Sequence, residues 1–369
     1  MAQLILQNLF SFIAIISLLV FVHEFGHFFV ARLCCVAIEQ FSIGFGSEII
    51  GFTDKKGTRW KFCAIPIGGY VKMYGDKNGA SMPDREAIDK MSEQEKQKSF
   101  IFKNVYQRIA IVAAGPAINF LFAIVIFTFL FKINGLNTIL PKVDTIIINS
   151  AAYEAGLQKN DEIMAINDQE ITDFNEMRQI VEQNADKKLI FQIKRNDKIL
   201  QKEITPKFHE STNIFGEKQR IGLLGITSQE VLHHNLNIFQ SFCQANLETF
   251  NISKAIFVAI GELITGKRDI KELGGPIKIA KYSGKTVSMG IIVVLWFMAL
   301  ISINLGVMNL LPIPILDGGH LLFYIFEAIF GKPMPQKIQQ IGFRIGFSLI
   351  LTLMIFTTYN DITQIFSQN

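Results

Sequence analysis

Charged residues are scarce in this chain. Aspartate, glutamate, lysine and arginine make up 18% of its 369 residues, whereas hydrophobic residues make up 50%. This balance is unusual for a soluble protein and indicates a protein that crosses a membrane several times. The net charge is only +4, and no basic run is interleaved with aromatic residues, so we expect no nucleic-acid partner.

Cysteine is also rare. The chain has four cysteines, Cys34, Cys35, Cys63 and Cys243. Their spacing matches neither a disulfide framework nor a zinc ribbon, and adjacent Cys34 and Cys35 cannot easily bridge each other. We therefore expect four free thiols.

The N-terminal region lacks the features of a cleaved secretory signal. No lysine or arginine precedes Arg32, and no small-residue cleavage site follows the apolar run at residues 4–30. That run is long enough to cross a bilayer with some tilt. We interpret it as a retained anchor and a first transmembrane helix.

Three further apolar runs have membrane-spanning length, at residues 105–131, 288–311 and 341–359. Lysine and arginine gather between the first two runs and around the start of the last one. The positive-inside rule places those segments in the cytoplasm. Both termini and the 132–287 region are then expected on the other side of the membrane.

Residues 38–75 predict β structure, because apolar and polar residues alternate between turn signals and glycines. Glycine within a strand marks the close approach of another backbone. Two interpretations stay open. The sheet could offer an exposed edge to an extended peptide by strand addition, or it could be a small structural cap on the first helix.

The chain is expected to be a polytopic α-helical membrane protein with an inserted α+β domain. We divide it into residues 1–131 with two spans and the β region, a soluble domain at 132–230, an amphipathic segment at 231–287, and residues 288–369 with the last two spans. Charged residues, including Lys254, Glu262, Lys267 and Arg268, favour a position of the third part on the membrane surface.

The soluble domain resembles a PDZ domain of the circularly permuted bacterial type. The resemblance rests on the turn Ala155-Gly156-Leu157, followed by Asp161, Ile163 and Asn167, and on a late strand at residues 220–226. The pattern departs from the family at Asn160 and Asp168, where glycine is usual. The alternative is an unrelated α+β domain.

The first span carries the sequence His23-Glu24-Phe25-Gly26-His27. A helix places residues i and i+4 on one face, so His23 and His27 can bind one metal ion with Glu24 beside them. Ionisable groups in a membrane helix are costly and usually functional. Two core histidines are the alternative, but with Glu24 between them they would be hard to satisfy without a metal.

A catalytic zinc ion usually has three protein ligands and a water molecule. His209, His233 and His234 fall on the opposite side of the membrane. Asp317 lies on the correct side, in a segment where Pro312 and Pro314 break the helix at membrane depth. A lone carboxylate would be expensive there without a cation. Asp317 could equally be a turn residue of Asp-Gly-Gly, and spacing alone does not decide.

Glu48 and His320 are two further candidate ligands. Glu48 is a downstream glutamate, which some soluble zinc peptidases use as the third ligand, but it lies in a predicted strand among glycines. His320 follows Asp317 closely and is interpreted as a turn residue or as a neighbour of the ligands.

The sequences His23-Glu24-Phe25-Gly26-His27 and Asn309-Leu-Leu-Pro-Ile-Pro-Ile-Leu-Asp317-Gly together resemble the site-2 protease family of intramembrane zinc metalloproteases. The order of elements, including Gly44-Phe45-Gly46 and a PDZ-like insert after the second span, resembles the bacterial regulator-of-sigma-E protease subgroup. The resemblance covers nearly the whole chain. It departs from larger members by carrying one PDZ-like domain instead of two.

The resemblance implies roles for the matching residues. His23, His27 and Asp317 would bind one Zn²⁺ ion, and Glu24 would be the general base. Asn309 would hold the substrate backbone. The residues expected to contact an unwound substrate helix are Gly44, Phe45, Gly46, Pro312 and Pro314.

The resemblance also implies partners and a location. Substrates would be single-span membrane proteins, such as an anti-sigma factor or remnant signal peptides, trimmed first by an upstream site-1 protease. The PDZ-like domain would act as a size filter or docking module. The chain would lie in the lipid bilayer of a bacterial inner membrane, with its active site near the cytoplasmic face. A non-catalytic PDZ-type scaffold and a metal transporter are the alternatives, although no inverted repeats are evident.

Overall fold

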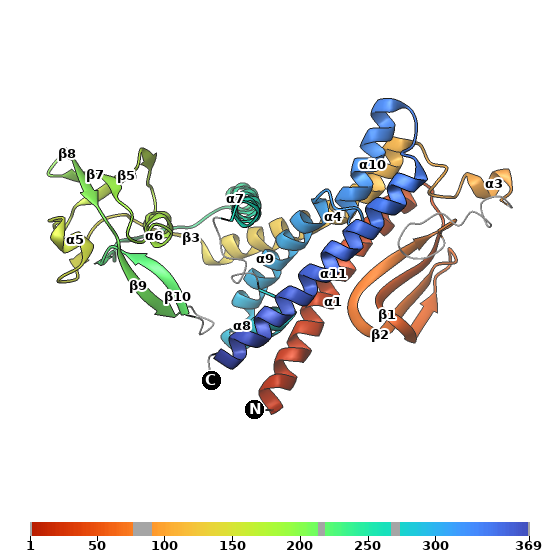
Figure 1. Ribbon diagram of the computed structural model, residues 1–369, viewed down its shortest axis with the longest axis horizontal. Coiled ribbons are helices and arrows are strands. Elements are labelled where there is room, and N and C mark those ends of the chain that lie inside the picture. Colours follow the sequence, from red (N-terminus) through yellow and green to blue (C-terminus); the bar gives the residue numbers. More distant parts are fainter. Residues whose placement is uncertain (1, 77–90, 213–217, 267–273, 368–369) are drawn as a thin grey trace. The chain divides into compact units, whose positions relative to one another are not determined.

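The computed structural model describes residues 2–76, 91–212, 218–266 and 274–367. Chain contacts divide it into two compact units, Met1–Phe129 with Gln240–Asn369, and Leu130–Phe239. Among the described residues, four helices are long and apolar enough to cross a membrane: α1 (Ala2–Leu33), α4 (Val105–Asn134), α9 (Ile291–Leu310) and α11 (Gln336–Ser367) (Figure 1). A long apolar helix thus lies at each of the four spans expected from the sequence, and α11 extends beyond the predicted run at both ends.

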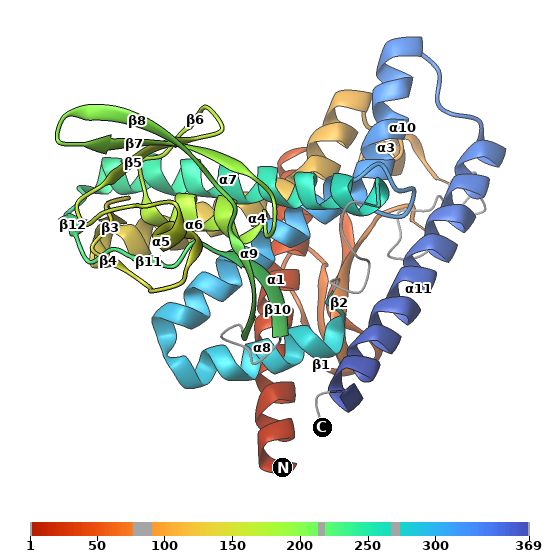
Figure 2. The same cartoon turned by 60° about the vertical axis from the view of Figure 1, so that its left-hand side comes forward.

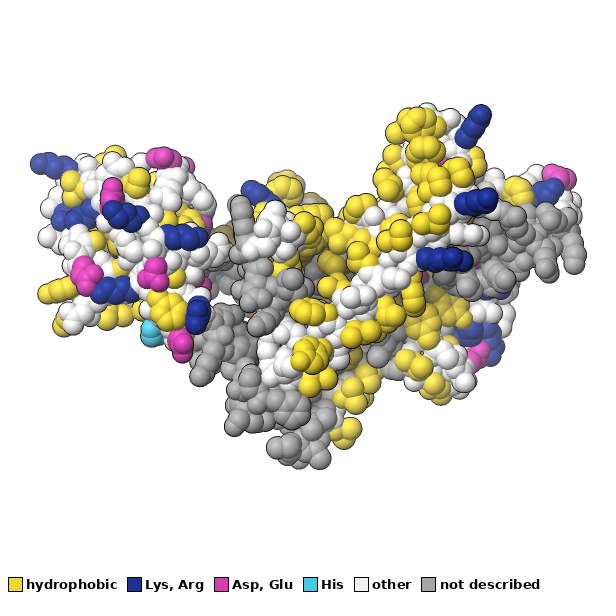
Figure 3. Space-filling view, in the orientation of Figure 1, with side chains coloured by type: hydrophobic (Ala, Val, Ile, Leu, Met, Phe, Trp, Pro, Cys, Tyr) yellow, Lys and Arg dark blue, Asp and Glu magenta, His cyan; other side chains and the backbone are white. Residues whose placement is uncertain are grey.

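These helices expose many apolar side chains, and their exposure to water would cost free energy. On α4, Leu121, Val125 and Phe129 are each at least half exposed and recur every four residues, which places them on one face. Hydrophobic side chains also cover α11 in the space-filling view (Figure 3). Leaving apolar area in water costs roughly 25 cal/mol per Å². The first unit is therefore a multi-pass membrane protein.

The remaining helices are shorter than these four, apart from α7 (Ile238–Ile264). The helices are α3 (Glu93–Lys96), α5 (Ala151–Glu154), α6 (Phe174–Glu182), α7 (Ile238–Ile264), α8 (Pro276–Met289) and α10 (Asp317–Phe330). The strands of the second unit are β3 (Leu136–Ile139), β4 (Thr145–Ile146), β5 (Glu162–Ile166), β6 (Gln169–Glu170), β7 (Leu189–Arg195), β8 (Lys198–Ile204), β9 (Lys207–Thr212), β10 (Lys218–Leu223), β11 (Ile226–Thr227) and β12 (Val231–His234). Helix α7 and most of α8 fall within the segment 231–287 that is predicted to be amphipathic, of which Lys267 and Arg268 lie outside the described residues.

Glycines bring α1 and α4 into backbone contact. A Cβ atom on Gly26 would lie 2.4 Å from the carbonyl oxygen of Ala114, and one on Gly115 would lie 2.2 Å from Nε2 of His27. Real Cβ atoms do not approach other atoms this closely, so neither position tolerates a side chain without a shift. Glycine and alanine at a membrane-helix interface permit such a close approach. The wall behind the histidines is thus the backbone of α4.

The β region is a hairpin whose two strands pair twice. Strands β1 (Ile38–Thr53) and β2 (Arg59–Met73) are antiparallel. Residues 40–43 of β1 pair with residues 59–62 of β2 and also with residues 69–72. The hairpin therefore bends on itself and forms a small curled sheet (Figures 1 and 2).

The bends of this sheet fall at glycines. Gly44, Gly46 and Gly68 have φ angles of 88°, 88° and 96°, in the region that side chains disfavour. A Cβ atom on Gly44 would also lie 2.6 Å from the carbonyl oxygen of Ile65. The sequence predicted strands here but not one continuous β2, because Pro66 and the pair Gly68-Gly69 indicated breaks. These glycines bend the strand without ending it.

Helix α8 begins against a carboxylate of α11. Asp361 is 1% exposed and accepts hydrogen bonds from the backbone N–H groups of Gly275, Ile277 and Lys278, at 2.9, 3.0 and 3.0 Å. The first N–H groups of a helix have no partner within the helix, and a carboxylate satisfies them with a favourable dipole interaction. Asp361 therefore joins α8 to the last span.

We expect Asp361→Ala to destabilise the protein by about 1–3 kcal/mol, because it leaves buried N–H groups without an acceptor. The midpoint of thermal denaturation in detergent measures the effect. Thr352→Ala, at an exposed position of the same helix, is the control and should change little. Equal midpoints for the two variants would contradict the capping role.

Asp76 follows the hairpin and is 3% exposed, and neither of its carboxylate oxygens has a hydrogen-bond partner among the residues that the structure describes. Burial raises its pKa to about 8 from an ordinary 3.8. Between these two values the unfolded chain is ionised here, while the folded chain keeps the proton. The folded state then binds more protons, so stability falls as pH rises through this interval.

Asp76→Asn should remove this pH dependence, because the amide keeps the shape and has no proton to lose. The variant should melt at a higher temperature than the parent protein at pH 8, and the two midpoints should converge towards pH 4. Melting curves across that range measure this. Parallel profiles at all pH values would be the contrary result.

The second unit is α+β. Its four-stranded antiparallel sheet has the order β6-β5-β7-β8, and its buried core includes Ile163, Met177 and Phe191. Asn160 and Asp168, where the PDZ pattern has glycine, have φ angles of 71° and 65°. Asparagine and aspartate tolerate this left-handed conformation better than other side chains. Both departures from the pattern thus keep the backbone conformation that glycine permits.

Candidate metal site and active site

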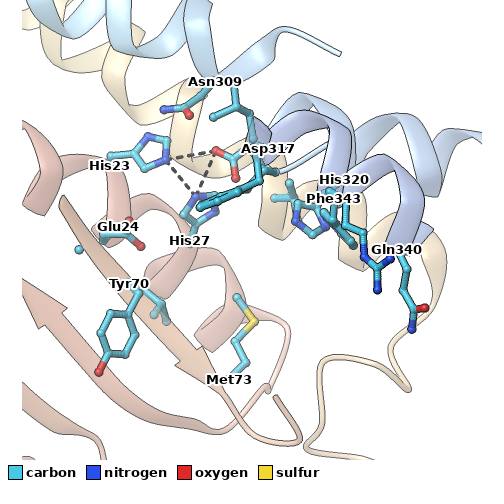
Figure 4. Close-up of a pocket in the computed structure, with 17 residues that line it drawn as sticks. His23, Glu24, His27, Tyr70, Met73, Asn309, Asp317, His320, Gln340 and Phe343 are labelled. Carbon is cyan, nitrogen blue, oxygen red and sulfur yellow. Dashed lines mark hydrogen bonds and ion pairs between the residues drawn. The ribbon is translucent and has the colours of Figure 1, made fainter. Parts of the chain in front are cut away.

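A cavity of about 520 Å³ lies in the first unit (Figure 4). Helices α1, α4, α9, α10 and α11, strand β2 and the segment before α10 contribute to its wall. The lining residues are His23, Glu24, His27, Gly69, Tyr70, Val71, Met73, Val112, Asn309, Ile315, Leu316, Asp317, His320, Gln340, Phe343, Arg344 and Phe347.

Three ligand-type side chains converge in this cavity. Nε2 of His23 lies 3.3 Å from Nε2 of His27, and the two atoms lie 3.1 and 3.4 Å from Oδ2 of Asp317. Ligand atoms held 2.0–2.1 Å from one zinc ion at tetrahedral angles lie roughly 3.3–3.4 Å from each other. The observed spacing fits one such ion, and two imidazoles with one carboxylate leave a coordination position for water.

Asp317 reaches this point because α9 ends before it. Helix α9 stops at Leu310, Pro312 and Pro314 keep the following chain from continuing the helix, and α10 begins at Asp317. A Cβ atom on Gly318 would lie 2.3 Å from the carbonyl oxygens of Leu310 and Leu311, so this tight turn requires glycine. Oδ2 of Asp317 is buried and has no well-oriented hydrogen bond. A buried carboxylate oxygen in that position calls for a cation.

The outer nitrogens of both rings face α4. Nδ1 of His27 lies 2.9 Å from the carbonyl oxygen of Ile111, and Nδ1 of His23 lies 3.0 Å from the side-chain amide of Asn119. Nδ1 of His27 can only donate to a carbonyl, so Nε2 of that ring is left free for a metal. Hydrogen bonds of this kind hold metal-binding histidines in one orientation.

Glu24 lies on the side of the cavity lined by β2. Its carboxylate interacts with the backbone N–H of Val71. A Cβ atom on Gly69 would lie 3.1 Å from Cγ of Glu24 and 2.7 Å from the carbonyl oxygen of Ser42. Glycine at this position lets the strand pass directly against the carboxylate.

The structure also separates some of the predicted substrate-binding residues from the cavity. Asn309 lines it, and Figure 4 shows its side chain near His23 and Asp317. The other predicted residues, Gly44, Phe45, Gly46, Pro312 and Pro314, are not among the lining residues. The ring of Phe45 stacks on that of Tyr70, which does line the cavity, with centroids 6.1 Å apart. Pro314 packs against Gly342 and Gly346 of α11.

The alternative ligands have other partners or positions. Glu48 forms an ion pair with Arg59 in the hairpin. His320 lines the cavity next to Phe343, but its ring does not join the three converging atoms. His233 belongs to the second unit and contacts Asn137. Among the described residues, the only group of three side chains arranged to hold a metal is His23, His27 and Asp317.

The sequence does not predict Asn119 or the residues from α11 as parts of the site. A signal was present in the sequence, since Asn119 is an amide in an apolar span three residues after Pro116. For Gln340, Phe343, Arg344 and Phe347 no comparable signal exists, because helix packing alone places them at the cavity.

Spanning helices that hold a His-His-Asp cluster beside a glutamate define the class of membrane-embedded zinc peptidases. Residues 11–353 match the family model described as Peptidase family M50. The chain belongs to this family, the site-2 protease family, and is a zinc metalloprotease.

Three relatives illustrate the likeness. A protein of Agrobacterium fabrum named "Putative zinc metalloprotease" is 41% identical over 358 residues, which cover 96% of this chain and 95% of the relative. A protein of Rickettsia conorii with the same designation is 40% identical over 365 residues, covering 98% and 99%. "Metalloprotease MmpA" of Caulobacter vibrioides is 33% identical over 379 residues, covering 96% and 95%.

Proposed function

We propose that this protein hydrolyses a peptide bond within or next to the transmembrane segment of single-span membrane proteins. The observation that carries the proposal is the convergence of His23, His27 and Asp317 beside Glu24, in a cavity walled by membrane-spanning helices. His23, His27 and Asp317 would hold the zinc ion, which would supply a Lewis acid for the scissile carbonyl and for the attacking water.

Glu24 acts as the general base. Its carboxylate takes a proton from the attacking water and passes it to the leaving amine. The neighbouring N–H of Val71 keeps the carboxylate oriented towards the cavity. Asn309, in the wall near Asp317, donates from its side-chain amide to the scissile carbonyl as negative charge develops there.

The substrate binds as an extended strand. A helix buries its carbonyl groups in internal hydrogen bonds, so a transmembrane helix must unwind before water reaches a peptide bond. Residues 69–72 of β2 pair with β1 on one side, and Gly69, Tyr70, Val71 and Met73 line the cavity. Within the described residues, no strand pairs with their other edge. Strand addition at that edge would place the substrate backbone beside Glu24.

The edge at residues 69–73 modifies the prediction made for Gly44, Phe45 and Gly46. Those residues shape the bend of the hairpin, and Phe45 supports Tyr70 from outside the cavity. Their contribution to substrate binding is to fix the position of the edge strand. Pro312 and Pro314 contribute by setting the path of the chain that leads to Asp317.

The distribution of charge and the family support a location and further partners. Arg32 and the basic residues of the hairpin favour a position of the end of α1 that carries the site near the cytoplasmic face of a bacterial inner membrane. The termini and the second unit lie on the opposite side. The second unit acts as a PDZ-like size filter that admits membrane stumps trimmed by an upstream site-1 protease. The left-handed conformation of Asn160 and Asp168 supports the PDZ assignment.

A purified, zinc-loaded protein in liposomes tests the proposal. Two single-span substrates that differ only in a helix-breaking Asn-Pro pair within the span are added, and the products are mapped by mass spectrometry. Cleavage should occur in or beside the span, proceed faster with the helix-breaking pair, and stop when zinc is chelated. Cleavage confined to soluble segments would overturn the proposal, and zinc binding without any cleavage would favour a scaffold or a transporter.

A further inference from the structure

Asn119 lies beside His23, one of the proposed zinc ligands. It is fully buried in α4, and its Nδ2 atom stands 3.0 Å from Nδ1 of His23. Its own Oδ1 atom is buried and has no hydrogen-bond partner. The two ends of an amide have nearly the same shape, so which end faces His23 has to be decided from the hydrogen bonds.

The position of Nε2 of His23 decides the orientation. That atom points at Nε2 of His27 and Oδ2 of Asp317, so in the metal-binding state it must present a lone pair. A neutral imidazole carries one proton, which is then on Nδ1. An Nδ1–H group cannot donate to the NH₂ end of an amide. With the amide rotated by half a turn, Oδ1 accepts this proton, and Nδ2 takes the position that has no partner among the described residues.

We infer that Asn119 presents its carbonyl oxygen to the Nδ1–H of His23 and thereby positions this ring as a metal ligand. The inference rests on the proposed zinc ligands. Asn119 is a positioning residue, because it acts through His23 and does not touch the reacting atoms.

The arrangement at His27 supports this assignment. Nδ1 of His27 donates to the carbonyl oxygen of Ile111 at 2.9 Å, so that ring has the same tautomer. Both acceptors belong to α4 and lie eight residues apart in sequence, about two helical turns. One helix therefore fixes the tautomers of both histidines, with a backbone carbonyl for His27 and a side-chain carbonyl for His23.

The position of Asn119 is itself held from the next helix. The hydroxyl group of Ser302, on α9, donates to the backbone carbonyl of Asn119 at 2.9 Å, and both residues are fully buried. The same helix carries Asn309 at its end. The contact between Ser302 and Asn119 therefore connects the residue that orients His23 with the helix that carries Asn309.

Zinc affinity, measured by chelator competition in detergent, tests the inference without relying on proteolysis. Asn119→Leu removes the acceptor and keeps the size of the side chain, and should weaken zinc binding by about 10–100-fold. Asn119→Asp keeps an acceptor and should stay within a few-fold of the parent protein. Asn360→Leu, at another buried asparagine of the first unit that does not line the cavity, should bind zinc normally.

Nitrogen NMR of labelled histidine provides the second measurement. In the zinc-bound parent protein, His23 should show a protonated Nδ1 coupled to an acceptor, and Asn119→Leu should lose that signature. Zinc affinity of Asn119→Leu equal to that of the parent, or an unprotonated Nδ1 in the zinc-bound parent, would overturn the inference and leave the proposed function standing. Parent protein that binds no zinc would instead refute the proposed function.

Discussion

Glu24→Gln is expected to retain zinc and to lose proteolysis by a factor on the order of 10²–10⁴. Glutamine keeps the size and the polar contacts of the side chain but cannot accept a proton from water at neutral pH. His23, His27 and Asp317 are untouched, so the metal should remain bound. Separation of metal binding from activity distinguishes a base from a ligand.

The measurement combines zinc content with cleavage of a single-span substrate in liposomes. Glu48→Gln is the matched control, because Glu48 carries the same functional group in the hairpin, where it pairs with Arg59 outside the cavity. That variant should keep nearly full activity. Full activity of Glu24→Gln would remove Glu24 from the mechanism, and loss of zinc would make it a ligand.

The second large effect is expected at the third ligand. Asp317→Ala should lower zinc affinity by at least 10²-fold and abolish cleavage, because two imidazoles alone make an incomplete catalytic site. The two ring nitrogens 3.3 Å apart would lose the carboxylate that the structure places against them. Chelator competition measures the affinity, and added zinc should restore activity poorly.

His320→Ala is the control for this variant. His320 lies on the same helix, three residues further on, and lines the same cavity, so it tests whether any loss of a polar group lowers zinc binding. We expect its zinc affinity to stay close to that of the parent protein. If His320→Ala loses zinc and Asp317→Ala keeps it, the ligand set has been assigned wrongly.

Much of the site was predictable because its signals are local. The i, i+4 spacing of His23 and His27 fixes their common face in any helix. The position of Asp317 beside the histidines depends on a long-range contact, since Asp317 follows His27 by 290 positions in the sequence. Pro312, Pro314 and the energetic cost of a charge at membrane depth indicated a functional role for Asp317. They did not exclude that Asp317 is a turn residue. The family resemblance made that choice, and the structure places Asp317 against the histidines.

Long-range pairing was predicted less well. Alternation indicated strands in residues 38–75, but a period of two does not reveal that one strand pairs with its partner in two registers. Asn119 was not predicted for a similar reason. An amide in an apolar helix can form a hydrogen bond with a neighbouring helix or with a metal ligand, and only the position of His23 distinguishes these two roles. The α11 residues of the cavity, at positions 340, 343, 344 and 347, share one helix face but mix polar and apolar side chains. Their spacing predicts a common face, and only packing brings that face to the cavity.

Gly115 and Gly69 limit which parts of the cavity can change in related enzymes. At Gly115 the cavity is closed behind the histidines by peptide backbone, and at Gly69 it is closed beside Glu24 by the edge of a strand. Backbone atoms are the same whatever the residue, so these two points do not change when side chains are exchanged. Side chains form other parts of the wall, among them Val112 of α4, Tyr70 of β2 and Phe347 of α11. Substitutions at those side chains can adapt the cavity to a new substrate, while the backbone contacts beside the catalytic groups stay constant.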